Sequence, residues 1–283
     1  MTGQKPIIAF MYDFDRTLCT KDMQEYTFIP HLGMSAESFW AQSNAMAKEQ
    51  KMDSILAYMY LMIKKSSARN LPIRRTDFVG MGRDIEFFPG VPEWFQRLNQ
   101  YGKGHGVRIE HYIISSGLKE IIEGSKIKDE FKEIYACEFH YDANGAADWP
   151  LLSVNYTGKT QFLFRINKGV LDISDDDTLN QYIPEDKRRV PFRNMVYIGD
   201  GLTDVPCMKL VKTHGGQSIA VYQEGKKELA RDLLTHGRVN FIAPADYSDD
   251  TELDSIAKQI IDQMAATNRL TELRKKQNTF FTR

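Results

Sequence analysis

The chain has 283 residues, of which 42% are hydrophobic and 27% are charged, so it has the size and composition of a globular protein of one or two domains. Its formal net charge of −1 provides no overall field that would attract nucleic acid or an anionic membrane surface. The three cysteines form no CxxC pair, which excludes the common zinc and disulfide patterns. The first apolar stretch is too short for a secretion signal or a membrane span, so we expect a cytoplasmic protein.

Short apolar runs alternate with helical patterns along most of the chain. The first run, residues 7–12, is continuous, as expected for a strand buried on both faces of a parallel sheet. Similar runs lie at 109–114, 134–139, 195–198, 218–222 and 239–242, and helical patterns lie at 91–98, 118–123, 159–166, 205–211 and 226–233. This alternation predicts an α/β fold with a doubly wound, mostly parallel sheet.

Residues 20–85 interrupt the alternation after the first strand. Apolar residues recur at helical spacing in 38–48 and 53–65, where Asp53 has the position of an N-cap. The methionines and aromatic residues of this pattern, Trp40 among them, are expected to form a small helical core. The sequence therefore predicts an all-helical domain of residues 20–85, inserted into a core made of residues 1–19 and 86–283.

Two later segments carry local signals. Asn144-Gly145, between two strand-like segments, predicts a tight hairpin. The polar and basic tail, residues 267–283, predicts a solvated helix or a frayed end.

Two pairs of carboxylates follow predicted strands. Asp13 and Asp15 come directly after the first strand and, two residues apart, project to the same side of an extended chain. Asp200 and Asp204 follow the strand at 195–198, in a loop that contains glycines. Open parallel sheets bind ligands at the carboxyl ends of their strands. Two acidic pairs at that edge indicate a site for a hard cation such as Mg²⁺, which prefers oxygen ligands.

Two further segments offer partners for a phosphate group. Ser115, Ser116 and Gly117 join a predicted strand to a helical pattern, where backbone N–H groups and a hydroxyl can hold an anion. Lys159 precedes the helix at 159–166 and supplies an ammonium group that can neutralise charge on a phosphoryl group.

Along the chain, these motifs read Asp-x-Asp-x-Thr at 13–17, a serine at a strand end, a lysine at a helix start, and Gly-Asp-Gly-x-x-Asp at 199–204. The set resembles the haloacid dehalogenase-like hydrolase superfamily, and within it the phosphoserine-phosphatase-like phosphatases, from residue 7 to about residue 222. The resemblance implies a Rossmann-like, three-layer core that carries a mobile helical cap, here residues 20–85.

The same resemblance implies a magnesium-dependent phosphatase that cleaves a small-molecule phosphomonoester through an aspartyl-phosphate. Asp13 is then the nucleophile, and Asp15 is the general acid and base, with a backbone carbonyl that reaches the metal. Asp200 binds Mg²⁺ directly and Asp204 supports it. The phosphoryl oxygens are bound by Ser115, Ser116, Gly117 and Lys159. A carboxylate nucleophile divides one difficult displacement into two easier steps.

Related functions differ from this one at few positions. Ser153 stands where a P-loop nucleotide triphosphatase requires its first glycine, so Gly158-Lys159-Thr160 is not a P-loop. Dehalogenases of the superfamily lack the second carboxylate that Asp15 supplies here. A phosphotransferase or phosphomutase shares that carboxylate and remains an alternative. A catalytically idle regulatory protein is the alternative from another class, although all four motifs are intact.

The part of the substrate beyond its phosphate is expected to contact residues near the first motif. Spacing matches Asp22 to the acidic residue that binds the substrate amine in phosphoserine phosphatases, with Glu25 as a nearby substitute. Both also suit the first turn of a helix, where the helix dipole favours acidic residues. Arg16 replaces a small residue of that group and is expected to narrow the entrance or to touch the substrate.

Overall fold

The computed structural model describes residues 5–69 and 71–281. A seven-stranded sheet has the order β4-β3-β2-β1-β5-β6-β7. Every neighbouring pair is parallel except β3 and β4, which are antiparallel. The strands are β1 (Ile7–Tyr12), β2 (Arg108–Leu118), β3 (Glu133–Tyr141), β4 (Ala147–Leu152), β5 (Met195–Gly199), β6 (Gln217–Tyr222) and β7 (Phe241–Pro244). The predicted α/β fold with a mostly parallel sheet is confirmed.

The central strand β1 is buried along its whole length. It pairs with β2 on one side and with β5 on the other. Its continuous apolar sequence fits this position because both of its faces are covered. The chain passes from β1 to β2 on one side and later returns to β5 on the other. The carboxyl end of β1 is therefore the place where the strand order reverses, and parallel sheets bind ligands at such a place.

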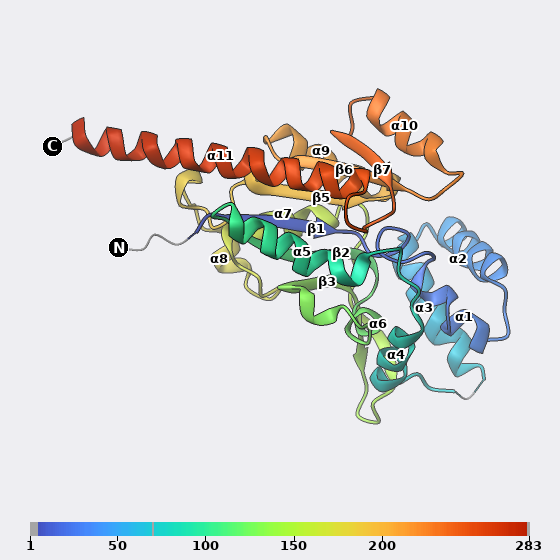
Figure 1. Ribbon diagram of the computed structural model, residues 1–283. Helices are drawn as coiled ribbons and strands as arrows, with labels where there is room; N and C mark the ends of the chain where they lie inside the picture. The colour runs from blue at the N-terminus through green and yellow to red at the C-terminus, as the bar shows by residue number, and fades with distance from the viewer. Residues whose placement is uncertain (1–4, 70, 282–283) are drawn as a thin grey trace.

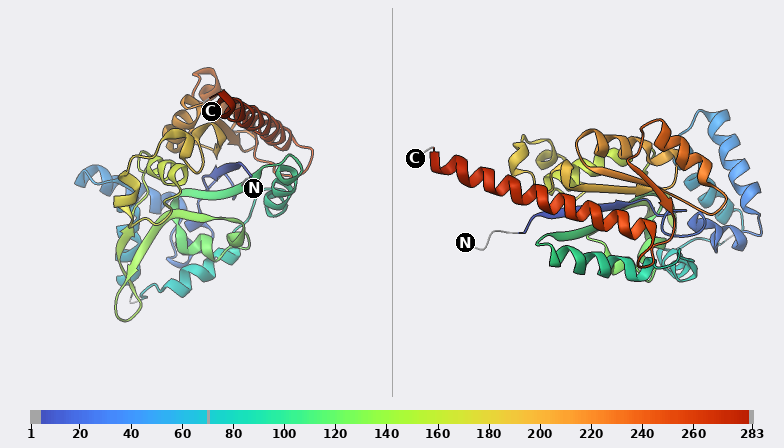
Figure 2. Two further views of the ribbon diagram at one scale, coloured as in Figure 1. Left: turned by 90° about the vertical axis from the view of Figure 1, so that its left-hand side faces the viewer. Right: turned by 45° about the horizontal axis from the view of Figure 1, so that its top comes forward.

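Helices cover both faces of the sheet and complete three layers (Figure 1). On one face α5 (Val91–Gly104) packs against α11 (Glu252–Phe281), and the rings of Trp94 and Tyr247 meet edge to face at 5.1 Å. On the other face α7 (Lys159–Lys168) packs against α9 (Val205–Thr213) (Figure 2). The remaining helices of the core are α6 (Lys119–Glu123), α8 (Asp176–Asn180) and α10 (Lys227–Thr235).

The segment between β1 and α5 is helical, as predicted, and lies beyond the carboxyl end of β1 (Figure 1). It contains α1 (Phe28–His31), α2 (Ala36–Gln50), α3 (Ser54–Ser67) and α4 (Arg75–Met81). Asp53 caps α3, as predicted, by accepting hydrogen bonds from two backbone N–H groups of its first turn. Phe28 packs against both Phe39 and Phe78, with ring centroids 6.4 and 6.1 Å apart, which gives the segment an aromatic core.

Packing and polar contacts both hold this helical segment on the core. α4 and the residues after it approach α6 so closely that a Cβ on Gly82 would lie 2.2 Å from a backbone carbonyl oxygen. The hydroxyl of Tyr58 in α3 donates to the carbonyl oxygen of Ser116 at 2.7 Å. The side chain of Asn155 donates to the carboxylate of Asp53 at 3.0 Å. The division into a core and a separate cap of residues 20–85 stays a prediction.

The structure differs from the prediction in two elements and adds a third. β4 is an edge strand that was absent from the predicted apolar runs, although the predicted hairpin implied a strand after it, and its Pro150 is tolerated because an edge strand has a side without a ladder partner. The predicted hairpin at Gly145, whose φ is 76°, joins β3 to β4. β2 continues through Leu118, and α11 begins at Glu252, well before the predicted tail. No helix in the described ranges has the length and apolar character that a membrane span requires.

Candidate active site

Asp13 lies at the carboxyl end of the central strand. Its backbone N–H donates to the carbonyl oxygen of Ile198 at 2.9 Å, so β1 remains tied to β5 up to this residue. The chain then turns, and the carbonyl oxygen of Phe14 accepts the N–H of Leu18 at 2.9 Å. The turn holds Arg16 at φ 57°, in the left-handed region that few residues other than glycine adopt. One tight loop therefore carries both carboxylates of the first motif.

Lys159 joins the two acidic motifs. Its Nζ lies 2.8 Å from Oδ1 of Asp13 and 2.7 Å from Oδ1 of Asp204. The hydroxyl of Tyr197 donates to the same oxygen of Asp204 at 2.9 Å. Burial by itself lowers the pKa of Lys159, but the two carboxylates outweigh burial and raise this pKa above its usual value. The ammonium is therefore charged and fixed between the motifs.

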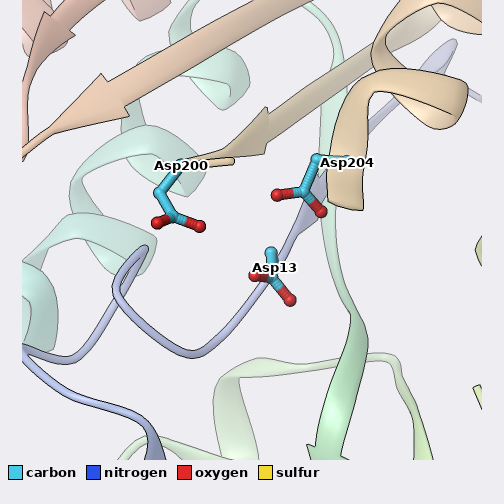
Figure 3. Close-up of side chains that lie close together, drawn as sticks. All are labelled: Asp13, Asp200 and Asp204. Atoms are coloured by element: carbon cyan, nitrogen blue, oxygen red, sulfur yellow. The ribbon is translucent and has the colours of Figure 1, made fainter. Parts of the chain in front are cut away.

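Three carboxylates face a common space (Figure 3). Oxygen atoms of Asp13, Asp200 and Asp204 all lie within 4.8 Å of one another. Burial, followed by repulsion from Asp204, raises the pKa of Asp13 to about 7, and Lys159 opposes this only in part. Burial, followed by repulsion from Asp204 and Asp13, raises the pKa of Asp200 to about 8. The structure thus brings the acidic pairs together, with more negative charge than one lysine neutralises.

The three carboxylates suit a hard divalent cation. Every group that they offer is an oxygen donor, which is the ligand type that Mg²⁺ selects. In the described part of the chain, the carboxylate of Asp200 has no hydrogen-bond or ion-pair partner, so its oxygens are available. Asp204 is different, because Lys159 and Tyr197 already occupy one of its oxygens. This agrees with the supporting role that the motif order implies for Asp204.

Asp15 lies on the same loop as Asp13, but its carboxylate is outside this trio. Its Oδ1 accepts a hydrogen bond from the backbone N–H of Met23 at 2.9 Å and from Sγ of Cys19 at 3.7 Å. Burial, followed by repulsion from Asp22 and then Asp13, raises the pKa of Asp15 well above its usual value. A carboxyl group that tends to keep its proton therefore lies next to Asp13.

Ser116, and not Ser115, reaches the open space above the carboxylates. β2 continues through Leu118, so the prediction that Ser115 stands at the strand end is wrong. Ser115 is fully buried, and its Oγ accepts the N–H of Gly117 at 3.0 Å. Ser116 lines the cavity, and its hydroxyl donates to the carbonyl oxygen of Val154 at 2.8 Å. Ser115 thus holds the backbone, and the side chain of its neighbour Ser116 lies at the cavity.

Two glycines make room for the carboxylates. A Cβ on Gly117 would lie 2.9 Å from Oδ2 of Asp15 and 2.2 Å from Cε of Met23. A Cβ on Gly199 would lie 2.5 Å from Oδ2 of Asp204. A Cβ atom is essentially never found so close to a nonbonded atom, so a side chain at Gly199 would displace Asp204, and one at Gly117 would displace Met23 and crowd Asp15.

A cavity of about 270 Å³ opens over these groups, between loops of the core and the helical segment. Its core side is lined by Asp13, Asp15, Ser116, Lys159, Asp200, Gly201 and Thr203. Its outer wall is formed by Arg16, Asp22, Gln24, Trp40, Ile55, Tyr58 and Tyr156. A larger cavity of about 440 Å³ lies within the helical segment, but none of the site carboxylates lines it. The smaller cavity is therefore the candidate active site.

The residues predicted to contact the substrate form a closed network. Nε and Nη2 of Arg16 donate to the two carboxylate oxygens of Asp22 at 3.0 and 2.8 Å. Nη2 also lies 3.8 Å from Glu25, which accepts the indole N–H of Trp40 at 2.8 Å and does not line the cavity. Because both carboxylates already have partners, the structure does not favour either as the receptor of a substrate amine.

Four polar or aromatic residues of the outer wall were missed by the sequence-based prediction. Gln24 lies in the 3₁₀ turn Met23–Glu25, Trp40 in α2, Tyr58 in α3, and Tyr156 in the loop before α7. Trp40 was expected in the helical core, since helical spacing does not distinguish a ring that faces a core from one that faces a cavity. No local pattern marks these four positions, because distant segments bring them together.

Comparison with known proteins agrees with this architecture. The chain is 28% identical over 282 residues to an uncharacterised protein of Borreliella burgdorferi, with 89% of this chain and 96% of that protein covered. A substrate-bound phosphoserine phosphatase complex has a TM-score of 0.58 at 15% identity and covers 90% of this chain and 99% of its own. A HAD family hydrolase of Salmonella enterica serovar Typhi has a TM-score of 0.56 at 17% identity, with 90% and 72% covered.

The family is established by the sequence itself. A model of the haloacid dehalogenase-like hydrolase family matches residues 10–209, a range that includes both acidic motifs, the serine segment and Lys159. The structural likeness is a likeness of fold, which the sheet order and the helical insertion already indicated. This chain belongs to the haloacid dehalogenase-like hydrolase family.

Proposed function

We propose that this protein is a Mg²⁺-dependent phosphatase that hydrolyses a small-molecule phosphomonoester through an aspartyl-phosphate on Asp13. The observation that carries the proposal is the place of Asp15, a second carboxyl with a raised pKa that lines the same cavity. Release of an alkoxide requires a proton donor of this kind, whereas release of a halide does not. Membership of the hydrolase family and the fold shared with a phosphoserine phosphatase support the same class.

The metal would be held by the carboxylates of Asp13 and Asp200 and by the backbone carbonyl of Asp15. Asp204 would keep Lys159 in place, since the two groups are 2.7 Å apart. The all-oxygen donor set and its excess negative charge support this assignment. When bound, Mg²⁺ neutralises charge on the phosphoryl group and aligns its oxygens.

In the first step, a carboxylate oxygen of Asp13 forms a bond to phosphorus while the bond from phosphorus to the ester oxygen breaks. The carboxyl group of Asp15 gives its proton to the departing oxygen, which leaves as an alcohol. Lys159 binds a phosphoryl oxygen, because its ammonium is already fixed 2.8 Å from Asp13. Ser116 lies beside these groups in the cavity, and Ser115 holds the backbone of this segment in position by accepting the N–H of Gly117.

In the second step, the carboxylate of Asp15 takes a proton from water, and the water oxygen attacks phosphorus. The bond between phosphorus and Asp13 breaks, and inorganic phosphate leaves. We assign residues 20–85 to a cap that covers the cavity during the first step and opens to exchange the alcohol for water. The substrate in this proposal is a free small molecule of the cytoplasm, with no nucleic acid or membrane as partner.

The test uses p-nitrophenyl phosphate with Mg²⁺ and compares wild type with Asp13→Asn and with Asp232→Asn, an exposed position of α10. Loss of the nucleophile is expected to lower kcat by about 10³-fold or more, while Asp232→Asn retains full activity. Chelation of Mg²⁺ should abolish turnover, and added Mg²⁺ should restore it. Full activity of Asp13→Asn would refute the nucleophile. Release of p-nitrophenol without inorganic phosphate, when an acceptor alcohol is present, would identify a phosphotransferase instead.

A further inference from the structure

Gln24 is a buried side chain whose polar atoms have no partner within the protein. Its exposed fraction is only 1%, and it lines the catalytic cavity. Its Oε1 is buried without a hydrogen bond, and across the described ranges its amide nitrogen has no partner either. A buried amide without a partner is costly, so most such groups in proteins are hydrogen-bonded. This carboxamide is therefore available to a molecule that occupies the cavity.

The backbone places Gln24 next to the point where the ester bond would break. The preceding residue, Met23, donates its backbone N–H to Oδ1 of Asp15 at 2.9 Å. Under the proposed function, Asp15 protonates the departing oxygen of the substrate. Gln24 is the next residue of the same short turn and lines the same cavity as Asp15, so it borders the space that the leaving group would occupy.

The charged side chains of the same wall are already paired with other side chains of the protein. Both carboxylate oxygens of Asp22 accept hydrogen bonds from Arg16. Glu25 accepts the indole N–H of Trp40 and does not line the cavity. An ammonium group on the substrate would find no unpaired carboxylate on this wall, and an anionic group would find no unpaired cation. The wall therefore suits a leaving group without charge.

Three aromatic rings and Ile55 form the rest of this wall. The rings of Trp40 and Tyr58 stand almost perpendicular, at 75°, with centroids 5.9 Å apart. Both rings are fixed, because the hydroxyl of Tyr58 donates to the carbonyl oxygen of Ser116 and the indole donates to Glu25. Fixed rings beside a hydrogen-bonding amide provide apolar contact for C–H groups and a polar partner for a hydroxyl.

We propose that Gln24 determines specificity through a hydrogen bond between its carboxamide and a hydroxyl of the leaving group, and that the substrates are phosphate esters of uncharged polyols or sugars. This inference rests on the proposed phosphatase function. The rings of Trp40 and Tyr58 pack against the carbon skeleton, and the carboxamide recognises a hydroxyl close to the ester oxygen. The cavity of about 270 Å³ limits the leaving group to a small polyol or a single sugar ring.

The test compares two esters of the same chain length, glycerol 3-phosphate and propyl phosphate, which lacks the hydroxyls. For wild type, the ratio of kcat/KM for the first ester to that for the second is measured, and the measurement is repeated with Gln24→Met. The near-isosteric methionine is expected to lower this ratio about tenfold, mainly through KM, the size of effect that one hydrogen bond produces. Gln50→Met, an exposed position at the end of α2, should keep the wild-type ratio.

The melting temperature of Gln24→Met distinguishes substrate recognition from a role in folding. Replacing an unpartnered buried amide by methionine should leave the melting temperature unchanged or raise it, because no hydrogen bond is lost. A clear fall in the melting temperature would show that the amide has a partner in the protein and would overturn the proposal. Gln24→Asn keeps the amide but shortens its reach by one methylene, and it should also lower the substrate ratio.

The class of leaving group is tested with wild type alone. Glucose 6-phosphate, ribose 5-phosphate and glycerol 3-phosphate should be better substrates than phosphoserine, phosphoethanolamine and phosphocholine. Preference for an amine ester would overturn the inference. If wild type hydrolyses esters but Gln24→Met leaves the glycerol-to-propyl ratio unchanged, only this inference fails. If wild type hydrolyses no ester, including p-nitrophenyl phosphate, the phosphatase function and this inference fail together.

Discussion

Replacing Lys159 by methionine removes the cation that the two acidic motifs share. Its ammonium is 1% exposed and contacts Asp13 and Asp204 at 2.8 and 2.7 Å. Deleting one partner of a buried ion pair costs about 3–5 kcal/mol, because a buried charge is left uncompensated. Two carboxylates lose their partner here, so we expect Lys159→Met to lower the free energy of unfolding by about 4–5 kcal/mol on that scale.

The expected change in melting temperature follows from this loss and from the unfolding entropy, which scales with chain length. Unfolding entropy is about 2.1 cal/mol/K per residue, so 283 residues give about 0.6 kcal/mol/K, and the variant should melt about 7–8 °C below wild type. The measurement is calorimetry in EDTA at pH 7.5. Lys209→Met, at an exposed position of α9, is the matched control and should differ from wild type by less than about 0.5 kcal/mol.

A double variant separates lost charge pairing from lost packing. In Lys159→Met with Asp204→Asn, one of the two unpaired charges is gone, so the loss of stability should be smaller than the sum of the two single losses. Equal stability of Lys159→Met and wild type would refute the view that the ammonium holds the carboxylates together. Strict additivity in the double variant would assign the loss to packing instead.

Two further outcomes follow from the site geometry. Gly199→Ala should lower the free energy of unfolding by about 1–3 kcal/mol, as overpacking does, because its Cβ would lie 2.5 Å from Oδ2 of Asp204. Gly201→Ala is the control in thermal unfolding, and it should be tolerated because its Cβ would have no atom nearer than 3.9 Å. The folded pKa values of Asp13 and Asp200, about 7 and about 8, lie above those of an unfolded aspartate. The contribution of these two groups to stability without metal is therefore fully present below about pH 4, the range of an unfolded aspartate, and is lost as pH rises through 7 and 8. Mg²⁺ requires deprotonated ligands, so it should remove that fall in stability and should bind more tightly at pH 8 than at pH 6. Titration calorimetry that shows no pH dependence of Mg²⁺ binding would contradict these assignments.

The amino-acid sequence alone was sufficient to predict at which edge of the sheet the acidic motifs meet. The runs that form β1 and β5 are local and strongly apolar, so Asp13 and Asp200 could be placed after strands without any tertiary information. The carboxyl ends of parallel neighbours lie at one edge, and the pairing of β1 with β5 brings the two residues together there. The N-cap of α3 at Asp53 was equally local, because a cap depends on residues within one turn.

Only the tertiary structure decided what surrounds these carboxylates. The pairing of β2 and β3 is irregular between Ile114 and Leu118, and the extension of β2 past its apolar run leaves Ser116, and not Ser115, on the cavity. Spacing along the chain could not show that Arg16 closes on Asp22 or that Gln24 is left without a partner. These contacts depend on side-chain direction and on segments far apart in sequence, which hydrophobic periodicity does not encode. Periodicity reports which face of an element is buried, whereas specificity in this cavity depends on which buried polar atom lacks a partner.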